Sequence, residues 1–189
     1  MKGIAIFASG SGTNAQKIME HFSNSKIAKV SLVLSNKADA FVLKRAEKMR
    51  IATTVFDRAD FYETKMVLNI LKEYNIDFIV LAGFLWLVPE ELVKMYRGRL
   101  INIHPALLPK YGGKGMYGDR VHKAVIDNGE SESGITIHHV NEVYDDGSII
   151  FQAKCEVRKD DTTDILAQRI HTLEHRYYPE VVEEVIAAL

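Results

Sequence analysis

Two polar residues near the middle of the chain have types and a spacing that suit catalysis. They are Asn102 and His104, in the segment LINIHPALLPKY at residues 100–111. Residues two apart in a strand project from the same face, and Pro105 favours an extended conformation at His104. An amide and an imidazole held side by side can stabilise an oxyanion and transfer a proton. A solvated strand end without function is the alternative explanation of the same pair.

Short apolar segments indicate the elements that position this pair. Five of them are typical of strands, at residues 3–8, 29–35, 52–57, 77–83 and 99–104, and helical patterns at residues 15–21, 40–49 and 61–74 separate the first four. Strands rich in Val, Ile and Leu that alternate with helices predict a mostly parallel sheet with helices on both faces. We therefore expect an α/β fold with an open, twisted, Rossmann-like sheet.

The pattern changes after residue 130. Segments 133–140 and 147–157 predict a β-hairpin around the turn-prone NEVYDD, and helical patterns follow at residues 161–174 and 179–188. No repeat or linker interrupts the chain, so we expect residues 1–189 to form a single domain. Ligands of open α/β sheets bind beyond the carboxyl ends of the strands, and Asn102 and His104 lie at such an end.

A glycine-rich turn follows the first predicted strand. GSGTNA at residues 10–15 matches the dinucleotide pattern G-x-G-x-x-G/A, which also needs an acidic residue about 20 residues later. The second strand ends instead in Ser35, Asn36 and Lys37, which weakens the nicotinamide interpretation. The amides of residues 11–14, which open a helix, would still bind one phosphate. A plain strand-to-helix turn explains the glycines equally well.

The segment HTLEH at residues 171–175 matches the zinc-binding pattern H-x-x-E-H. Two histidines four residues apart share a helical face and could chelate a metal. Only 14 residues follow, which leaves little room for a third ligand on a separate helix. We therefore expect no metal site.

Five further residues have a structural interpretation beside the functional one. One of His138 and His139 must face the covered side of the sheet, where a structural histidine is commoner than a catalytic one. Asp145 and Asp146 suit a turn for conformational reasons alone. Trp86 follows a buried strand and fits either the core or a pocket wall. Spacing alone therefore does not name a reaction.

The composition is that of a soluble globular protein, with 47% hydrophobic and 26% charged residues and a formal net charge of −1. This charge gives no electrostatic footprint for nucleic acid or an anionic membrane. The single Cys155 excludes an internal disulfide and suits a reducing compartment. No apolar segment has the length of a signal peptide or a membrane span. We expect a cytoplasmic protein without nucleic-acid or membrane partners.

Seven segments, taken in order, closely resemble the phosphoribosylglycinamide formyltransferase family of formyltetrahydrofolate-dependent enzymes. They are SGSGTN, LSNKADAF, VLAGFLWLVP, LINIHPALLPKY, GITIHHV, YDDGSIIFQAKCEV and LEHRYYPEVV. Members of that family transfer the formyl group of 10-formyltetrahydrofolate to the amine of glycinamide ribonucleotide in purine synthesis. The resemblance implies the same reaction here, with the formyl folate as cosubstrate, no metal, and a monomer or homodimer.

The resemblance also implies the site residues. The catalytic residues would be Asn102, His104 and Asp145, with a protonated His104 and Asn102 as oxyanion donors and Asp145 favouring the imidazolium. The ribonucleotide-binding residues would be Gly12, Thr13, Asn14, His171 and Glu174. The folate-binding residues would be Arg58, Leu85, Trp86, Leu87, Val88, Asn102, Val140, Asn141 and Tyr144.

One segment departs from the family pattern. Residues 112–124 read GGKGMYGDRVHKA, where members usually show a G-x-H-x-H run, so we expect a remodelled loop beside the site. Three rival functions are disfavoured. Formyltetrahydrofolate hydrolases resemble this fold joined to an N-terminal regulatory domain, and methionyl-tRNA formyltransferases carry an additional C-terminal RNA-binding domain. A non-catalytic nucleotide-binding module does not account for the polar cluster.

Overall fold

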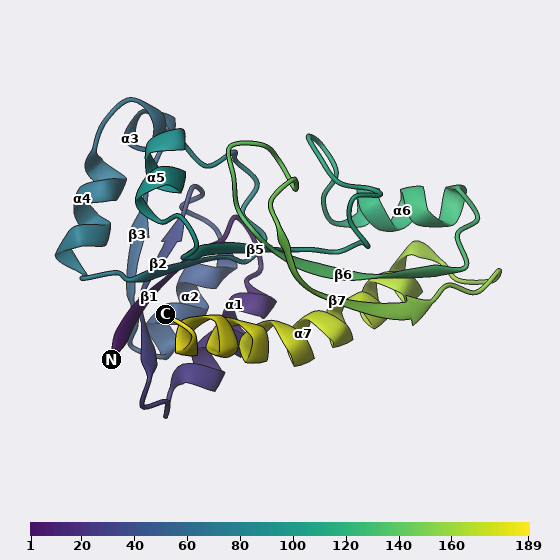
Figure 1. The fold of residues 1–189 in the computed structure, drawn as a ribbon, viewed down its shortest axis with the longest axis horizontal. Helices are drawn as coiled ribbons and strands as arrows, with labels where there is room; N and C mark the ends of the chain where they lie inside the picture. Colours follow the sequence, from purple (N-terminus) through teal and green to yellow (C-terminus); the bar gives the residue numbers. More distant parts are fainter.

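Seven strands form one sheet in the order β3-β2-β1-β4-β5-β6-β7 in a computed structural model that describes residues 1–189 (Figure 1). The strands are β1 (Lys2–Phe7), β2 (Ala28–Ser35), β3 (Ala52–Val55), β4 (Phe78–Leu81), β5 (Leu100–His104), β6 (Glu132–His139) and β7 (Ile149–Glu156). The first five run parallel, and β6 and β7 are antiparallel to their neighbours. The predicted α/β class and the hairpin are confirmed.

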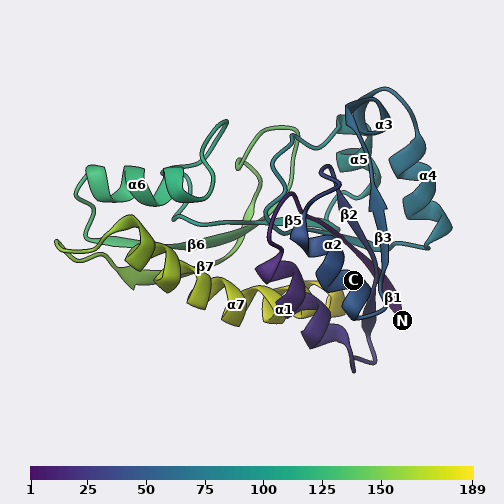
Figure 2. The ribbon, with the colours of Figure 1, turned by 180° about the vertical axis from the view of Figure 1, so that it is seen from behind.

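Helices cover both faces of the sheet. They are α1 (Thr13–Phe22), α2 (Phe41–Lys48), α3 (Arg58–Tyr62), α4 (Met66–Glu73), α5 (Glu90–Met95), α6 (Asp119–Asp127) and α7 (Thr163–Ala187). Helices α3, α4 and α5 lie on one side, and α1, α2 and α7 lie on the other (Figure 1, Figure 2). The alternation along β1 explains this, since Ile4 and Ile6 pack into one apolar layer while Ala5 and Phe7 pack into the other.

The single helix predicted at residues 61–74 is wrong, because the segment forms two helices. Asp57 and Asp60 make a capping box that starts α3 earlier than the apolar pattern suggests. The Thr64 hydroxyl then donates to the Asp60 carbonyl and accepts from the Met66 amide, at 3.3 Å and 3.1 Å. This side chain satisfies backbone groups at the break and so separates α3 from α4.

The two helices predicted at the C-terminus are also wrong, because α7 is continuous through Pro179. A proline inside a helix removes one backbone hydrogen bond, which normally favours a break. Here Tyr178, Val181 and Val182 on either side of the proline are buried in the core. The Tyr178 hydroxyl also donates to the Leu81 carbonyl at 2.9 Å. Burial of this face outweighs the lost bond.

Helices α5 and α6 have no counterpart among the predicted elements. Helix α5 has only six residues, which is too short for a clear period. Helix α6 packs against α7 and buries Val121 and Val125. None of the helices is long and apolar enough to cross a membrane.

The strand order places several loops at one edge of the sheet. Strand β1 pairs with β2 on one side and β4 on the other, so the direction of winding reverses between β1 and β4. Open α/β sheets bind ligands at the carboxyl ends beside such a reversal. The loops after β1 and β4 and the end of β5 meet at this position.

Candidate active site

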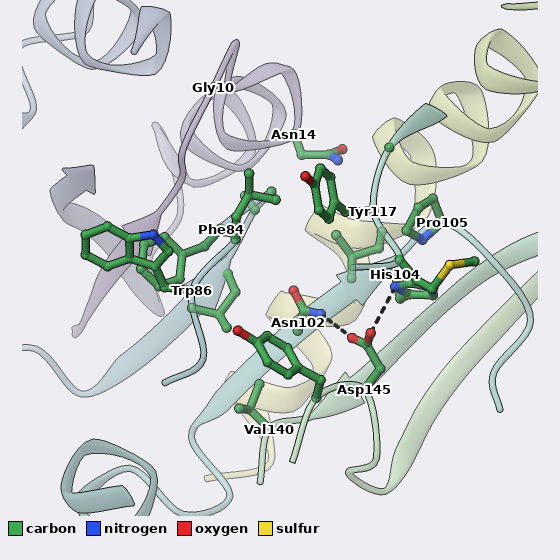
Figure 3. A pocket seen from close by; sticks show the side chains of 18 of the residues that line it. Gly10, Asn14, Phe84, Trp86, Asn102, His104, Pro105, Tyr117, Val140 and Asp145 are labelled. Carbon is green, nitrogen blue, oxygen red and sulfur yellow. Dashed lines mark hydrogen bonds and ion pairs between the residues drawn. The ribbon is translucent and has the colours of Figure 1, made fainter. Parts of the chain in front are cut away.

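One cavity of 590 Å³ opens at this edge of the sheet (Figure 3). Its walls come from the turn after β1, the loop after β4, the end of β5, the loop before α6, the turn after β6, and α7. The volume falls in the range of small-molecule sites. All three predicted catalytic residues, Asn102, His104 and Asp145, line it.

The Asn102 side chain is held by two neighbours. Its Nδ2 donates to His138 Nε2 at 3.2 Å and lies 3.5 Å from Asp145 Oδ1. His138 Nδ1 lies 2.8 Å from the His139 carbonyl oxygen, so it must carry the proton, which leaves Nε2 as an acceptor. In this arrangement Asn102 turns its amide oxygen toward the cavity (Figure 3). A donor role at an oxyanion requires a half-turn of the amide.

His104 is buried, and both ring nitrogens face protein groups. Nε2 lies 2.7 Å from the Tyr111 carbonyl oxygen and so donates to it, while Nδ1 lies 3.5 Å from Asp145 Oδ2. Burial lowers the pKa of His104 below its usual value, although the charge of Asp145 and the Tyr111 carbonyl act in the opposite direction. His104 is therefore largely neutral at pH 7 in the resting site, whereas the family resemblance implies a protonated His104.

Asp145 is the point where the polar groups converge. Its Oδ2 accepts from the Gly113 amide at 2.9 Å, and its backbone has a left-handed φ of 54°. Burial tends to raise the pKa of Asp145, but the neighbouring rings of His138 and His104 and the Gly113 amide together lower it below its usual value. Asp146 instead accepts from Asn141 at 3.1 Å. Of the two turn aspartates, only Asp145 reaches the site.

The predicted phosphate cradle opens α1 at the opposite end of the cavity. Gly12 is the N-cap with a φ of 72°, and no side chain caps the first turn. The backbone amides of the first turn of α1 are therefore free to bind an anion. A Cβ at Gly12 would lie 2.4 Å from a Val42 methyl group, so this glycine also lets α2 pack closely. Asn36 occupies the position at which a dinucleotide site needs an acidic residue, and its side-chain oxygen accepts a hydrogen bond from the Ser9 hydroxyl at 2.7 Å.

The predicted ribonucleotide residues of α7 lie beside the cradle. Glu174 is 6% exposed and accepts from Asn14 Nδ2 at 2.9 Å. Burial raises the pKa of Glu174, which favours its protonated form. His171, one turn earlier, also lines the cavity. Its ring stacks on His175 at 6.1 Å, and no third His, Cys, Asp or Glu completes a metal-binding group with them.

The predicted folate residues form the other half of the cavity. Its lining includes Leu85, Trp86, Leu87, Val88, Val140, Asn141 and Tyr144. The Tyr62 hydroxyl donates to the Leu87 carbonyl at 2.8 Å and fixes the loop that carries the indole. Arg58 is the exception, because it does not line the cavity. Its guanidinium lies over the Tyr62 and Trp86 rings, at 5.2 Å from each, behind the wall.

Sequence reasoning missed two histidines of the site. A structural role was expected for whichever of His138 and His139 faces the covered side of the sheet, yet His138 faces Asn102 directly in the antiparallel register of β5 and β6. Only the register of the hairpin against β5 would have shown this. His122 on α6 lines the cavity, and burial lowers its pKa to about 4. Its helix was not predicted, so no pattern pointed to it.

Known proteins resemble this chain along nearly its whole length. Phosphoribosylglycinamide formyltransferase of Arabidopsis thaliana, a chloroplastic protein, is 43% identical over 96% of this chain and 64% of its own length. The protein of the same name from Escherichia coli K12 is 40% identical over 95% of this chain and 84% of its own length. The chain thus spans less than two thirds of the plant relative and most of the bacterial one.

A solved structure gives the same result for the fold. The crystal structure of phosphoribosylglycinamide formyltransferase from Streptococcus pneumoniae superposes with a TM-score of 0.86 at 38% identity, and covers 98% of this chain and 99% of that one. Residues 2–182 match the family model described as formyl transferase. The chain therefore belongs to the formyl transferase family.

Proposed function

We propose that the chain transfers the formyl group of 10-formyltetrahydrofolate to the amine of glycinamide ribonucleotide, giving formylglycinamide ribonucleotide and tetrahydrofolate in purine synthesis. The observation that supports this most is one cavity lined by a phosphate cradle, an aromatic wall and the three polar residues Asn102, His104 and Asp145. Relatives with the corresponding name support the choice of substrates. Residues 1–189 are proposed to act as a single formyltransferase domain in the cytoplasm.

The first step is attack of the substrate amine on the formyl carbon. The C–N bond forms, the formyl oxygen becomes an oxyanion, and the amine must lose a proton. A largely neutral His104 is suited to take that proton, because burial lowers its pKa. The resulting imidazolium lies 3.5 Å from Asp145, whose negative charge stabilises it. Because Nε2 already carries the hydrogen that it donates to the Tyr111 carbonyl, His104 would receive the amine proton at Nδ1.

The second step is loss of the folate. The oxyanion reforms the carbonyl, the bond to folate N10 breaks, and His104 returns its proton to that nitrogen. With its side-chain amide rotated by half a turn, Asn102 would donate a hydrogen bond to the oxyanion of the intermediate. To pair with the rotated amide oxygen, His138 would have to carry a proton on Nε2, the atom that lies 3.6 Å from Asp145 Oδ1. No covalent enzyme intermediate is needed.

The two ends of the cavity would hold the two substrates. The first-turn amides of α1, at Thr13 and Asn14, are proposed to bind the ribonucleotide phosphate, with Gly12 shaping the turn. Glu174 and His171 would face the glycinamide part. The pterin would lie against the loop at residues 85–88 and against Val140 to Tyr144, with its tail toward Arg58 outside the cavity.

The test is a rate measurement with both substrates. Deformylation of 10-formyltetrahydrofolate is followed with and without glycinamide ribonucleotide. The proposal predicts turnover that depends on the nucleotide. Turnover that is independent of it would identify a hydrolase instead, and no turnover under either condition would favour a binding protein.

A further inference from the structure

Lys114, on the loop between β5 and α6, and Arg120, in the first turn of α6, place two unpaired cations on the wall of the cavity. Lys114 and Arg120 are the only lysine or arginine among the lining residues. Neither Lys114 nor Arg120 takes part in an ion pair, so no carboxylate lies within 4 Å of their charged nitrogens. Both side chains are exposed at the mouth of the cavity. Their charges are thus available to a ligand.

No lysine or arginine other than Lys114 and Arg120 lines the cavity that contains the phosphate cradle. Burial lowers the pKa values of His104 and His122, so both are largely neutral at pH 7. Arg45, the arginine next to the cradle, is already engaged by the Ser11 carbonyl at 2.7 Å and by Gln16. The amides of α1 contribute only partial charges. Lys114 and Arg120 are therefore the cationic side chains of the cavity lining that are free to pair with a phosphate dianion in the cradle.

The side chain between the two cations connects the loop with the cradle. Tyr117 is 42% exposed, and the Arg120 guanidinium lies 5.0 Å from its ring centre. Tyr117 lines the same cavity as Asn14, and Figure 3 draws both side chains. Lys114, Tyr117 and Arg120 therefore share one cavity with the phosphate cradle.

Glycines give this loop its conformation. Gly113, Gly115 and Gly118 have φ values of 94°, 89° and 52°, which other residues rarely adopt. A Cβ at any of them would meet no atom within 4 Å, so they serve the backbone conformation and not close packing. The Gly113 amide also anchors the loop to Asp145 at 2.9 Å.

We propose that Lys114 and Arg120 bind the phosphate of the ribonucleotide from the side opposite the α1 amides, with Tyr117 orienting Arg120. This inference rests on the proposed function, because it assigns the specificity of the same cavity for a phosphorylated amine. It gives the atypical glycine-rich loop a role in selecting the substrate. Arg and Lys pair with phosphate through charge-assisted hydrogen bonds, which are stronger than neutral ones.

The test compares glycinamide ribonucleotide with the same compound lacking its phosphate. Lys114→Gln and Arg120→Gln should each raise KM for the ribonucleotide by about tenfold or more, the effect of losing one hydrogen bond to a charged group. KM for the folate and kcat should change by less than about twofold. The variants should treat the dephosphorylated substrate as the wild type does. Lys123→Gln is the matched control, because Lys123 lies on α6 but pairs with Asp127 at 2.8 Å outside the cavity.

Calorimetric binding of glycinamide ribonucleotide to the folate-free protein separates this inference from the proposed function. A wild type that binds the ribonucleotide without turnover, with weaker binding in both variants, would uphold the phosphate site and reject the transferase. Turnover by the wild type with equal ribonucleotide KM in the variants would overturn the phosphate site alone. A rise in folate KM instead would assign the two cations to the folate carboxylates, which also overturns it.

Discussion

Asp145→Asn removes the negative charge at the centre of the site and keeps the shape of the side chain. Asp145 Oδ2 lies 3.5 Å from His104 Nδ1. With an effective dielectric constant of about 20, two unit charges at that distance attract by roughly 5 kcal/mol. The side chain is 11% exposed, and an asparagine oxygen still accepts from the Gly113 amide. The substitution abolishes this attraction, and we expect about half of it to appear in the barrier because the surroundings relax, which lowers kcat by about a hundredfold.

The pH dependence shows whether the loss acts through His104. Asp145 raises the pKa of His104 against the effect of burial, so its removal lowers that pKa further. Since a neutral His104 is the proposed base, the acid limb of kcat/KM should move to lower pH in the variant. Steady-state rates with both substrates between pH 4.5 and 8 measure both effects.

Asp146→Asn is the matched control, because Asp146 pairs with Asn141 and does not reach the site. It should change kcat by less than about twofold. A fully active Asp145→Asn enzyme would refute the catalytic assignment. A slow variant with an unmoved acid limb would refute the role of Asp145 in controlling His104.

Three further predictions follow from the site and its surroundings. Gly12→Ala should lower the free energy of unfolding, measured by urea denaturation, by about 2 kcal/mol or more, because the new Cβ would be held at a left-handed φ and would clash with Val42. Gly10→Ala is the control, because its Cβ would meet no atom within 4 Å and should change the free energy of unfolding little. His122 is protonated below about pH 6.5 in the unfolded chain but stays neutral to about pH 4 in the native state, so the free energy of unfolding should fall by about 2–3 kcal/mol as the pH drops through this window. The His122→Gln variant should lose less stability in acid, and an equal pH dependence in both proteins would contradict the burial of a neutral His122. A folate analogue should change the fluorescence of Trp86, the sole tryptophan, and an unchanged spectrum at saturation would remove the indole from the folate wall.

The fold was largely predictable because its signals are local and repeated. The five apolar segments of the parallel sheet lie within a few residues of the observed strands, since strands buried on both faces need continuous apolar sequence. The errors occur where tertiary packing or a side-chain cap competes with a local preference. Thr64 breaks a helix that periodicity extends, and Pro179 fails to break one whose face is buried. Short helices such as α5 offer too few residues for a period.

The site was predictable to a different extent for each kind of residue. Asn102 and His104 share one strand, so their spacing alone indicated a common face. Asp145 joined them only through the family resemblance, because its position depends on the path of a turn. His138 and the amide group of Gly113 were not predictable, since they reach the site through strand register and loop conformation. The orientation of the Asn102 amide likewise depends on neighbours distant in the sequence.

The fate of a labelled formyl group tests the central proposal most directly. The enzyme is mixed in excess with 10-formyltetrahydrofolate carrying an isotopic label in the formyl carbon, and glycinamide ribonucleotide is added in the same single turnover. We expect the label to appear on the amine of the ribonucleotide at the rate of folate deformylation, and to stay on the folate when the ribonucleotide is omitted. Release of the label as formate at the same rate with or without the ribonucleotide would contradict the account.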